Sequence, residues 1–465
     1  MRTRSFCLGL VLTAVMGLAP EAARCQDVQL PAPRVVRGQD YSPPDPVFPL
    51  PLYHERPETG GFYAAGNFLM LRQTNPLKEQ PIAVRGFVDT FGNVQATQNF
   101  LSEVELGVTG PTPVPGLFIG SGKPALDVNQ VSGPNSYQPG FRINLGWKFQ
   151  NDLDIEFSWS HLFTKKLSAT AAPIGPTLSG GPDGSDSFLF APVYNFSNNY
   201  VGPASKLIVS TTIPFDFTAG PFPIGFLADQ IFHTSPGPVG IWNAAQLMTI
   251  QFTQRYDDFE IIGRIPIYES DRCRCYGLFG PRHVQLWERF QWRTVDESVR
   301  EIHLDIVGAG FDQVFNRGDA GGLSGPLDQA IYSNIVSNRL YGPLFGLGSD
   351  LYVGHGFGIN LDLRCGSYID VVKERAKYEL GDHSTAAQRS RTDYTMAYEL
   401  DARLNLTWYP IEGVELRFGY ELQNFFNTVS SPQPIDFNMG SITPTWDKGT
   451  YRLLDGFSAG ISFIF

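Results

Sequence analysis

The last ten residues of the chain, Gly456-Phe-Ser-Ala-Gly-Ile-Ser-Phe-Ile-Phe465, are the stretch that decides the fold. Their odd-numbered positions carry Phe457, Ala459, Ile461, Phe463 and Phe465, and Ser458, Gly460 and Ser462 lie between them. A period of two is typical of a β-strand with one apolar face. The chain is therefore expected to end in a strand whose final residue is aromatic.

Such an ending is typical of the closing strand of a bacterial outer-membrane barrel, in which the terminal segment is the assembly signal. Phe463 and Phe465 are the predicted signal residues, and the barrel assembly machinery is the expected partner. The last strand of a soluble β-sandwich is the alternative. Composition favours the barrel, because Gly 48, Phe 35 and Tyr 19 are abundant while charged residues make up 17%. A net charge of -11 argues against nucleic acid as a partner.

The chain divides into three predicted regions. Residues 1–25 read as a secretory signal peptide, because Arg2 and Arg4 precede an apolar run and Ala23 and Cys25 are small. Residues 26–60 are proline-dense and aperiodic, which predicts an extended periplasmic leader. Residues 61–465 are predicted to form the barrel, and no apolar run after the signal approaches the ~18 residues of a membrane helix.

Alternation of apolar and polar residues recurs along the third region, as in Phe141 to Phe149 and Val414 to Leu422. It predicts an all-β, transmembrane, antiparallel up-and-down β-barrel of about 12 strands, apolar outside and polar inside. The strands are expected at 62–72, 139–149, 153–163, 243–256, 259–269, 283–295, 300–310, 340–353, 357–373, 395–409, 414–427 and 455–465.

Connections between these strands alternate in length, as outer-membrane barrels require. Tight turns are predicted at 150–152, 257–258, 296–299, 354–356 and 410–413. Long extracellular loops are predicted at 73–138 and 164–242, others at 311–339, 374–394 and 428–454, and a shorter connection at 270–282. Glu288 does not fit, because it would face lipid unless a bulge shifts the register.

The inward face carries charges of both signs, and it holds the candidate functional residues. The predicted pore-lining residues are Arg142, Lys148, Asp154, Glu156, Asp362, Arg364, Asp401, Arg403, Glu415 and Arg417, and Arg289, Arg293, Asp305 and Glu421 share this expected face. One interpretation is a polar channel whose charges select solutes. The other is an internal ion-pair network that fills a narrow barrel, and the sequence leaves both open.

Signatures of other chemistry are weak. Ser158 and Ser160 lie near His161, but Ser158 and His161 have opposite parity in a strand and point apart. No catalytic residue and no cofactor is predicted. No metal site is predicted either, because no ligand set surrounds Cys273 and Cys275. A bridge from one of these cysteines to Cys365 stays open, and the tryptophans are expected in interfacial girdles: Trp147, Trp159, Trp287, Trp292 and Trp408.

The segments Gly280–Val295, Asn338–Gly346 and Phe418–Asn424 resemble a planctomycete family of outer-membrane β-barrel proteins of unknown function. They are also similar to Legionella-type pore-forming outer-membrane proteins. The resemblance covers about the last half of the chain and implies an outer-membrane barrel with pore activity.

The predicted function is passive passage of small polar solutes or ions through a barrel in the cell outer membrane, surrounded by outer-membrane lipid. A structural or surface-interaction barrel with a plugged lumen and contact-making loops is the alternative, and an enzyme is not expected.

Overall fold

The computed structural model describes the protein from Gly61 to its end, with gaps. The described residues are 61–89, 116–132, 136–149, 153–172, 188–194, 245–270, 272–295, 329–354, 356–380, 385–411 and 413–465, a few single residues between these ranges, and the backbone of 301–307 and 310–316. The predicted signal peptide and leader lie outside the described residues, as do most of 90–115 and all of 195–241.

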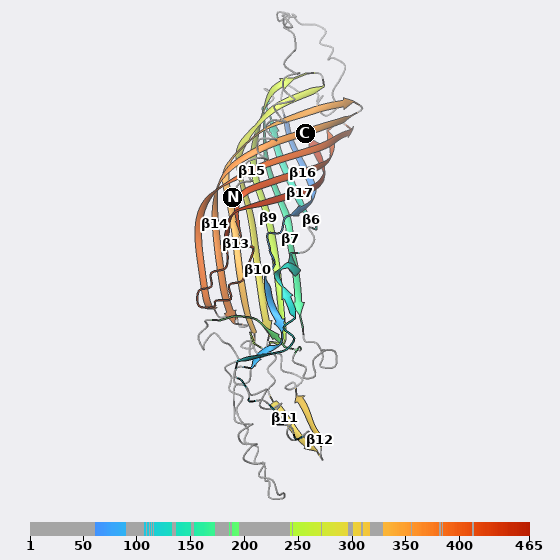
Figure 1. Cartoon of the computed structure of the whole chain (residues 1–465). Coiled ribbons are helices and arrows are strands. Elements are labelled where there is room, and N and C mark those ends of the chain that lie inside the picture. Colours follow the sequence, from blue (N-terminus) through green and yellow to red (C-terminus); the bar gives the residue numbers. More distant parts are fainter. Residues whose placement is uncertain are drawn as a thin grey trace, which may run out of the picture. The chain divides into compact units, whose positions relative to one another are not determined.

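A closed antiparallel ring of ten strands forms the centre of the fold (Figure 1). The chain closes the ring by pairing β1 with both β6 and β17, with Tyr63 opposite Gly146 and Ile464. In chain order the ring strands are β1 (Gly61–Gln73), β6 (Gln138–Lys148), β7 (Asp154–Ala171), β9 (Leu247–Glu269), β10 (Cys273–Val295), β13 (Gln329–Gly354), β14 (Phe357–Leu380), β15 (Thr385–Ile411), β16 (Val414–Ser430) and β17 (Asp447–Ile464).

Short elements in the connections make three further sheets. They are β2 (Pro81–Arg85) with β5 (Pro124–Asp127) and β8 (Leu189–Phe190), β3 (Phe87–Asp89) with β4 (Leu117–Ile119), and β11 (Glu301–Val307) with β12 (Gly310–Asn316). A 3-10 turn, η2 (Val128–Val131), follows β5. Helices long and apolar enough to cross a membrane do not occur among the described residues.

The all-β antiparallel barrel predicted from the alternation is confirmed, but the count of about twelve strands is wrong by two. The predicted turn at Asp257 and Asp258 does not exist, because β9 runs straight through it. Adjacent residues in a strand face opposite sides, so Asp258 points inward to Arg282 and Asp257 points outward to His161. The predicted strand at 300–310 pairs with β12 and lies outside the ring.

The short connections after β6, β9, β13 and β15 lie at one end of the ring, where β1 begins and β17 ends, and we call it the tight-turn end. One further short connection, between β14 and β15, lies at the other end. Gly354, Gly356 and Gly413 have positive φ values of 109°, 80° and 76° at two turns of the tight-turn end, a conformation that glycine adopts without strain. The predicted connections at 374–394 and 270–282 are far shorter than expected, because β14 extends to Leu380 and β10 begins at Cys273.

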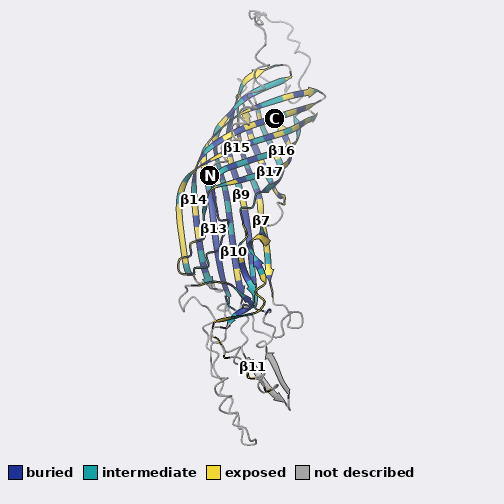
Figure 2. Ribbon diagram, viewed as in Figure 1, coloured by how far each residue is buried: buried dark blue, intermediate teal, exposed yellow. Residues whose placement is uncertain are grey.

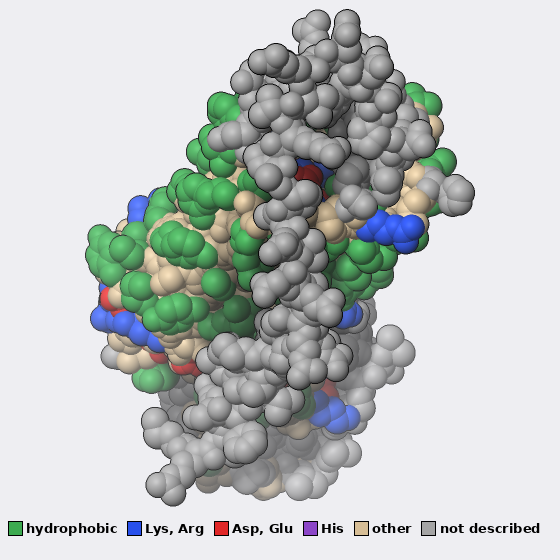
Figure 3. All heavy atoms as spheres, turned by 90° about the horizontal axis from the view of Figure 1, so that it is seen from above, with side chains coloured by type: hydrophobic (Ala, Val, Ile, Leu, Met, Phe, Trp, Pro, Cys, Tyr) green, Lys and Arg blue, Asp and Glu red, His purple; other side chains and the backbone are tan. Residues whose placement is uncertain are grey.

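Large apolar side chains cover the outside of the ring near the tight-turn end, and we call this zone the belt. On β14 it includes Phe357, Ile359, Leu361 and Leu363, and each is exposed while its neighbours in sequence are more buried (Figure 2). On β13 it runs from Val353 to Tyr341, about 30 Å of height at a rise of about 3.3 Å per residue and a tilt of about 45°. Figure 3 shows such side chains over much of one face.

Beyond the belt the outward face of the strands becomes polar and the inward face becomes mainly apolar, and we call this the exchange of faces. On β14 the outward residues change from Ile369 to Lys373 and Arg375, while the inward ones change from Asp362 to Ala376 and Tyr378. The strands are long enough for both zones, since β13, β14 and β15 have 26, 24 and 27 residues. The ring is therefore apolar outside and polar inside in the belt. Beyond the belt, β14 is polar outside and its inward face is mainly apolar, with buried exceptions such as Asp370 and Glu374.

An apolar core fills the ring beyond the belt, and we call it the cap. Barrel residues such as Trp292 and Tyr332 pack there against residues from the two long connections, such as Ile82, Leu126 and Leu189. The segment between β16 and β17 adds Ile435, Met439 and Ile442. Residues of the predicted loops 73–138 and 164–242, such as Ile82, Leu126 and Leu189, thus pack with barrel residues in this core, whereas 164–171 continue the ring strand β7.

Candidate functional site: the barrel lumen

All ten predicted pore-lining residues point into the ring. Arg142, Glu156, Asp362, Arg364, Asp401, Arg403 and Glu415 are buried there, and Lys148, Asp154 and Arg417 are half-buried. Glu421 also points inward, whereas the side chain of Asp305 lies outside the described residues. The parity of the belt strands therefore placed these side chains correctly. Whether solutes pass among them stays a prediction.

The prediction of which side chains face inward was wrong for one stretch of β10. Arg289 and Arg293 lie on the outside, while Glu288 is buried inside as the ion-pair partner of Arg452. Trp292, expected in a girdle, is fully buried in the cap. The physical reason is the exchange of faces, because this part of β10 lies beyond the belt and keeps its apolar residues inside. No bulge at Glu288 is involved, since the pairing with β13 is continuous.

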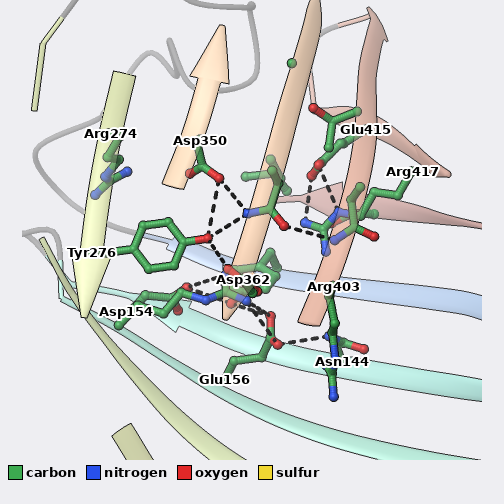
Figure 4. Close-up of a pocket in the computed structure, with 18 of the residues that line it drawn as sticks. Asn144, Asp154, Glu156, Arg274, Tyr276, Asp350, Asp362, Arg403, Glu415 and Arg417 are labelled. Atoms are coloured by element: carbon green, nitrogen blue, oxygen red, sulfur yellow. Dashed lines mark hydrogen bonds and ion pairs between the residues drawn. The ribbon is translucent and has the colours of Figure 1, made fainter. Parts of the chain in front are cut away.

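A polar cavity of about 240 Å³ occupies the lumen at the tight-turn end (Figure 4). Tyr63 on β1 donates its hydroxyl to Asp154 and Glu156 on β7, at 2.8 and 2.9 Å. Arg264 on β9 lies 3.4 Å from both of these carboxylates. A mixed wall of phenol, carboxylate and guanidinium groups therefore surrounds the entrance.

The opposite wall of this cavity is tied together by hydrogen bonds. Asn360 on β14 donates to the Tyr276 hydroxyl and to Asp350, both at 2.7 Å, and Tyr276 donates to Asp362 at 2.8 Å (Figure 4). Arg417 pairs with its strand neighbour Glu415 at 2.8 Å. Most of these polar groups are therefore hydrogen-bonded or ion-paired to one another.

Deeper in the lumen, ion pairs connect strands across the ring. Arg142 on β6 makes a two-pronged pair with Glu421 on β16, with both contacts at 2.6 Å. Glu260 on β9 lies 3.3 Å from both Arg364 on β14 and Arg403 on β15. Two-pronged pairs of this kind are strong and directional, so they hold opposite walls together.

Arg282 on β10 is the most enclosed member of this layer. Its guanidinium contacts Asp258 on β9 and Glu399 on β15, each at 2.8 Å, and all three side chains are 0% exposed. Tyr368 adds a hydroxyl donated to Glu399 at 2.6 Å. Solvent does not reach these atoms. The charged groups therefore connect the walls of the lumen at this level, and in the described part of the chain no water-filled path runs past them.

An apolar layer follows directly above the ion pairs. It takes side chains from every ring strand except β6, and each is at most 1% exposed. Its members are Leu69, Leu71, Leu162, Tyr256, Val284, Leu286, Leu340, Tyr368, Ala397, Phe425 and Leu454. The phenol of Tyr256 also spans the lumen to Gln423 on β16, at 2.8 Å. The described residues therefore fill the cross-section of the barrel at this level.

Several lumen residues escaped the sequence reasoning. Tyr63, Arg264, Tyr276 and Arg282 were not singled out, although each has the parity of the inward face of its strand. The alternation within the predicted strand 259–269 already puts Arg264 on the inward side, whereas Tyr276 and Arg282 fell in the predicted connection 270–282. Their partners could not be found this way, because the partner residues are distant in sequence and the strand register decides which meet.

The residues considered for other chemistry are separated. Ser158 and Ser160 are buried inside the ring, where Ser160 accepts a hydrogen bond from Arg142 at 2.7 Å. His161 lies outside and pairs with Asp257 at 2.6 Å. The prediction that Ser158 and His161 point apart is confirmed. Cys273, Cys275 and Cys365 are free thiols, and the first two have sulfur atoms 3.9 Å apart.

No family model matches the sequence, and no curated protein matches it either. Among solved structures it is similar to the outer membrane protease OmpT from Escherichia coli, with a TM-score of 0.37, 9% identity and coverage of 87% of this chain and 97% of that one. It is similar to the toluene transporter TodX of P. putida, with a TM-score of 0.21, 8% identity and coverage of 90% and 92%. It is also similar to a Pseudomonas aeruginosa FadL homologue, with a TM-score of 0.20, 7% identity and coverage of 88% and 90%.

All three TM-scores lie below 0.5, so these likenesses carry no argument about this chain. The planctomycete and Legionella-type families named above stay predictions.

Proposed function

We propose that this chain is an outer-membrane β-barrel with a closed lumen, which anchors an apolar-cored extension beyond the bilayer. The observation that carries the proposal is the apolar layer, because it takes side chains from nine of the ten ring strands and leaves each at most 1% exposed. The cap adds a second apolar core on the same axis. This favours the structural or surface-interaction alternative over the pore.

The belt supports the location in the outer membrane. Its height of about 30 Å is close to the apolar band of about 25 Å that membrane barrels present to lipid. The tight-turn end would face the periplasm, since both terminal strands begin and end there. The long connections would then lie at the cell surface, within and around the cap.

Other parts of the proposal follow from this placement. Outer-membrane lipid and the barrel assembly machinery are the expected partners, with Phe463 and Phe465 as the assembly signal. No cofactor and no enzymatic reaction is proposed, and nucleic acid is not an expected partner. Phe465 packs on Phe62 with ring centroids 5.9 Å apart, which places the terminal aromatic at the seam where the ring closes.

Single-channel recording tests the closed lumen. The signal-free chain, refolded and inserted in a planar bilayer, is expected to give no stepwise current, and Arg364→Glu and Arg417→Glu are expected to stay silent as well. A general porin in the same membrane is the positive control, and heat-modifiable gel mobility establishes that the barrel has folded.

Stepwise current from the wild type, with an ion selectivity that moves in the two glutamate variants, would overturn the closed lumen. Small polar solutes would then be the partners, and the ten lumen residues would line the path.

A further inference from the structure

The outer wall just beyond the belt is strongly basic on one side of the ring, although the chain as a whole has a charge of -11. On β9, β10, β13 and β14 the outward cations are Arg255, Arg289, Arg293, Arg339, Lys373, Arg375 and Lys377. The outward carboxylates on the same described stretches are Asp257 and Glu379, and these pair with His161 and Lys377. Most of the cations therefore lack a carboxylate partner among the described residues.

A groove of about 320 Å³ lies within this basic surface, and we call it the outer groove. The strand register defines it as three rows across β10, β13 and β14. The rows are Arg289, Ile335 and Arg375; Gln291, Ser333 and Lys377; and Arg293, Ile331 and Glu379. Short side chains of β13 form the floor, and long side chains of β10 and β14 form the walls.

The first row places two guanidinium groups on opposite walls. Strands two apart in a sheet are separated by about 10 Å, so two arginine side chains can reach one anion held over the strand between them. Arg289 donates to the amide oxygen of Gln291, and Arg375 donates to that of Gln388 at 3.0 Å. These partners are neutral, so neither guanidinium has a carboxylate partner among the described residues.

We propose that the outer groove binds the phosphate-bearing headgroup of an amphiphile in the outer leaflet, an inference that rests on the proposed orientation in the outer membrane. Arginine matches phosphate with two parallel hydrogen bonds, which suits a groove that is lined by one arginine on each wall. Ser333 lies in the middle row and offers a hydroxyl to the same anion.

The height of the groove fits a lipid rather than a free anion. On β14, Arg375 lies about 13 Å along the strand from the belt residue Val371. At a strand tilt of about 45° this corresponds to about 9 Å along the membrane normal. A headgroup layer is about 5–8 Å thick, and a guanidinium reaches several Å back toward it. Ile369 on the same strand lies in the belt, where an acyl chain of the same molecule would run.

Native mass spectrometry of the refolded full chain in a neutral detergent tests the proposal. The probes are a diphosphorylated glucosamine-disaccharide lipid, its dephosphorylated form, and inorganic phosphate. The wild type is expected to retain the phosphorylated lipid and not the dephosphorylated one. The double variant Arg289→Gln/Arg375→Gln is expected to bind it on the order of a hundredfold more weakly, about tenfold for each arginine.

The matched control is Arg72→Gln, which removes an outward cation from β1 on another part of the ring. It is expected to bind the lipid like the wild type. Equal binding by the double variant, or equal weakening by the control, would overturn the groove as the site. Competition by inorganic phosphate below 1 mM would show that the free anion is sufficient and would overturn the lipid as ligand. The readout is independent of conductance, so a failure here is separate from a failure of the closed lumen.

Discussion

Removing Arg282 tests the idea that the ion-pair layer holds the barrel walls together. Arg282→Met keeps most of the side-chain volume and deletes the guanidinium, which contacts Asp258 through two atoms at 2.8 and 2.9 Å and Glu399 at 2.8 Å. The two carboxylates come from β9 and β15, so the substitution leaves two negative groups in a lumen that solvent does not reach.

The expected loss follows from that burial. Breaking one buried ion pair by removing a single partner costs about 3–5 kcal/mol, because the remaining charge is left uncompensated. Here one cation contacts Asp258 and Glu399 and also lies 3.6 Å from Glu260 and 3.7 Å from Asp401. Tyr368 still donates to Glu399 and partly offsets the loss. We therefore expect the free energy of unfolding to fall by about 4 kcal/mol or more.

Urea titration of tryptophan fluorescence in lipid vesicles measures this free energy. The control is the triple variant Arg282→Met/Asp258→Asn/Glu399→Gln, in which the carboxylates become neutral amides, and it is expected to recover more than half of the loss. A free energy within 1 kcal/mol of the wild type for Arg282→Met alone would refute the reasoning, because the layer would then contribute nothing to the closed barrel.

Two other predictions concern the zones above and outside this layer. Trp292→Ala removes a fully buried side chain from the cap, so we expect the free energy of unfolding to fall by about 3–5 kcal/mol. We also expect faster proteolysis near β2, while the belt residues stay protected. Unchanged proteolysis would mean that the cap does not hold the loops. In a background with Cys273, Cys275 and Cys365 changed to serine, Leu361→Cys is expected to resist a water-soluble maleimide in vesicles and Arg375→Cys to react. Equal labelling of the two positions would place the edge of the belt elsewhere.

Sequence alternation was sufficient for the belt but not for the rest of the barrel. In the belt, apolar residues face outward on every strand, so a single rule of parity placed residues such as Arg142 and Asp362 inside. Beyond the belt the same rule fails, because burial in a protein core also selects apolar residues. Arg289 and Glu288 were assigned to the wrong faces for this reason, and the residues from Glu374 to Lys377 were taken for the start of a loop.

Two adjacent acidic residues misled the strand count in a similar way. Asp257 and Asp258 resemble a turn in sequence, since carboxylates are common in turns and rare in membrane strands. Each has a cationic or histidine partner on its own side of the sheet, and those partners, Arg282 and His161, are supplied by other strands. Pairings of this kind depend on three-dimensional register and could not be read from local pattern.

The exchange of faces along the strands also fixes how deep the barrel sits in a bilayer. A shift of the ring by a few residues that moved the cap toward the bilayer would bring Lys373 and Arg375 into hydrocarbon, and a cation on the lipid face costs up to about 2–4 kcal/mol at the midplane. A shift the other way would expose Ile369 and the aromatic side chains below it to water. Long strands such as β10 and β14 thus carry their own depth markers, and together these markers hold the barrel at one level along the membrane normal.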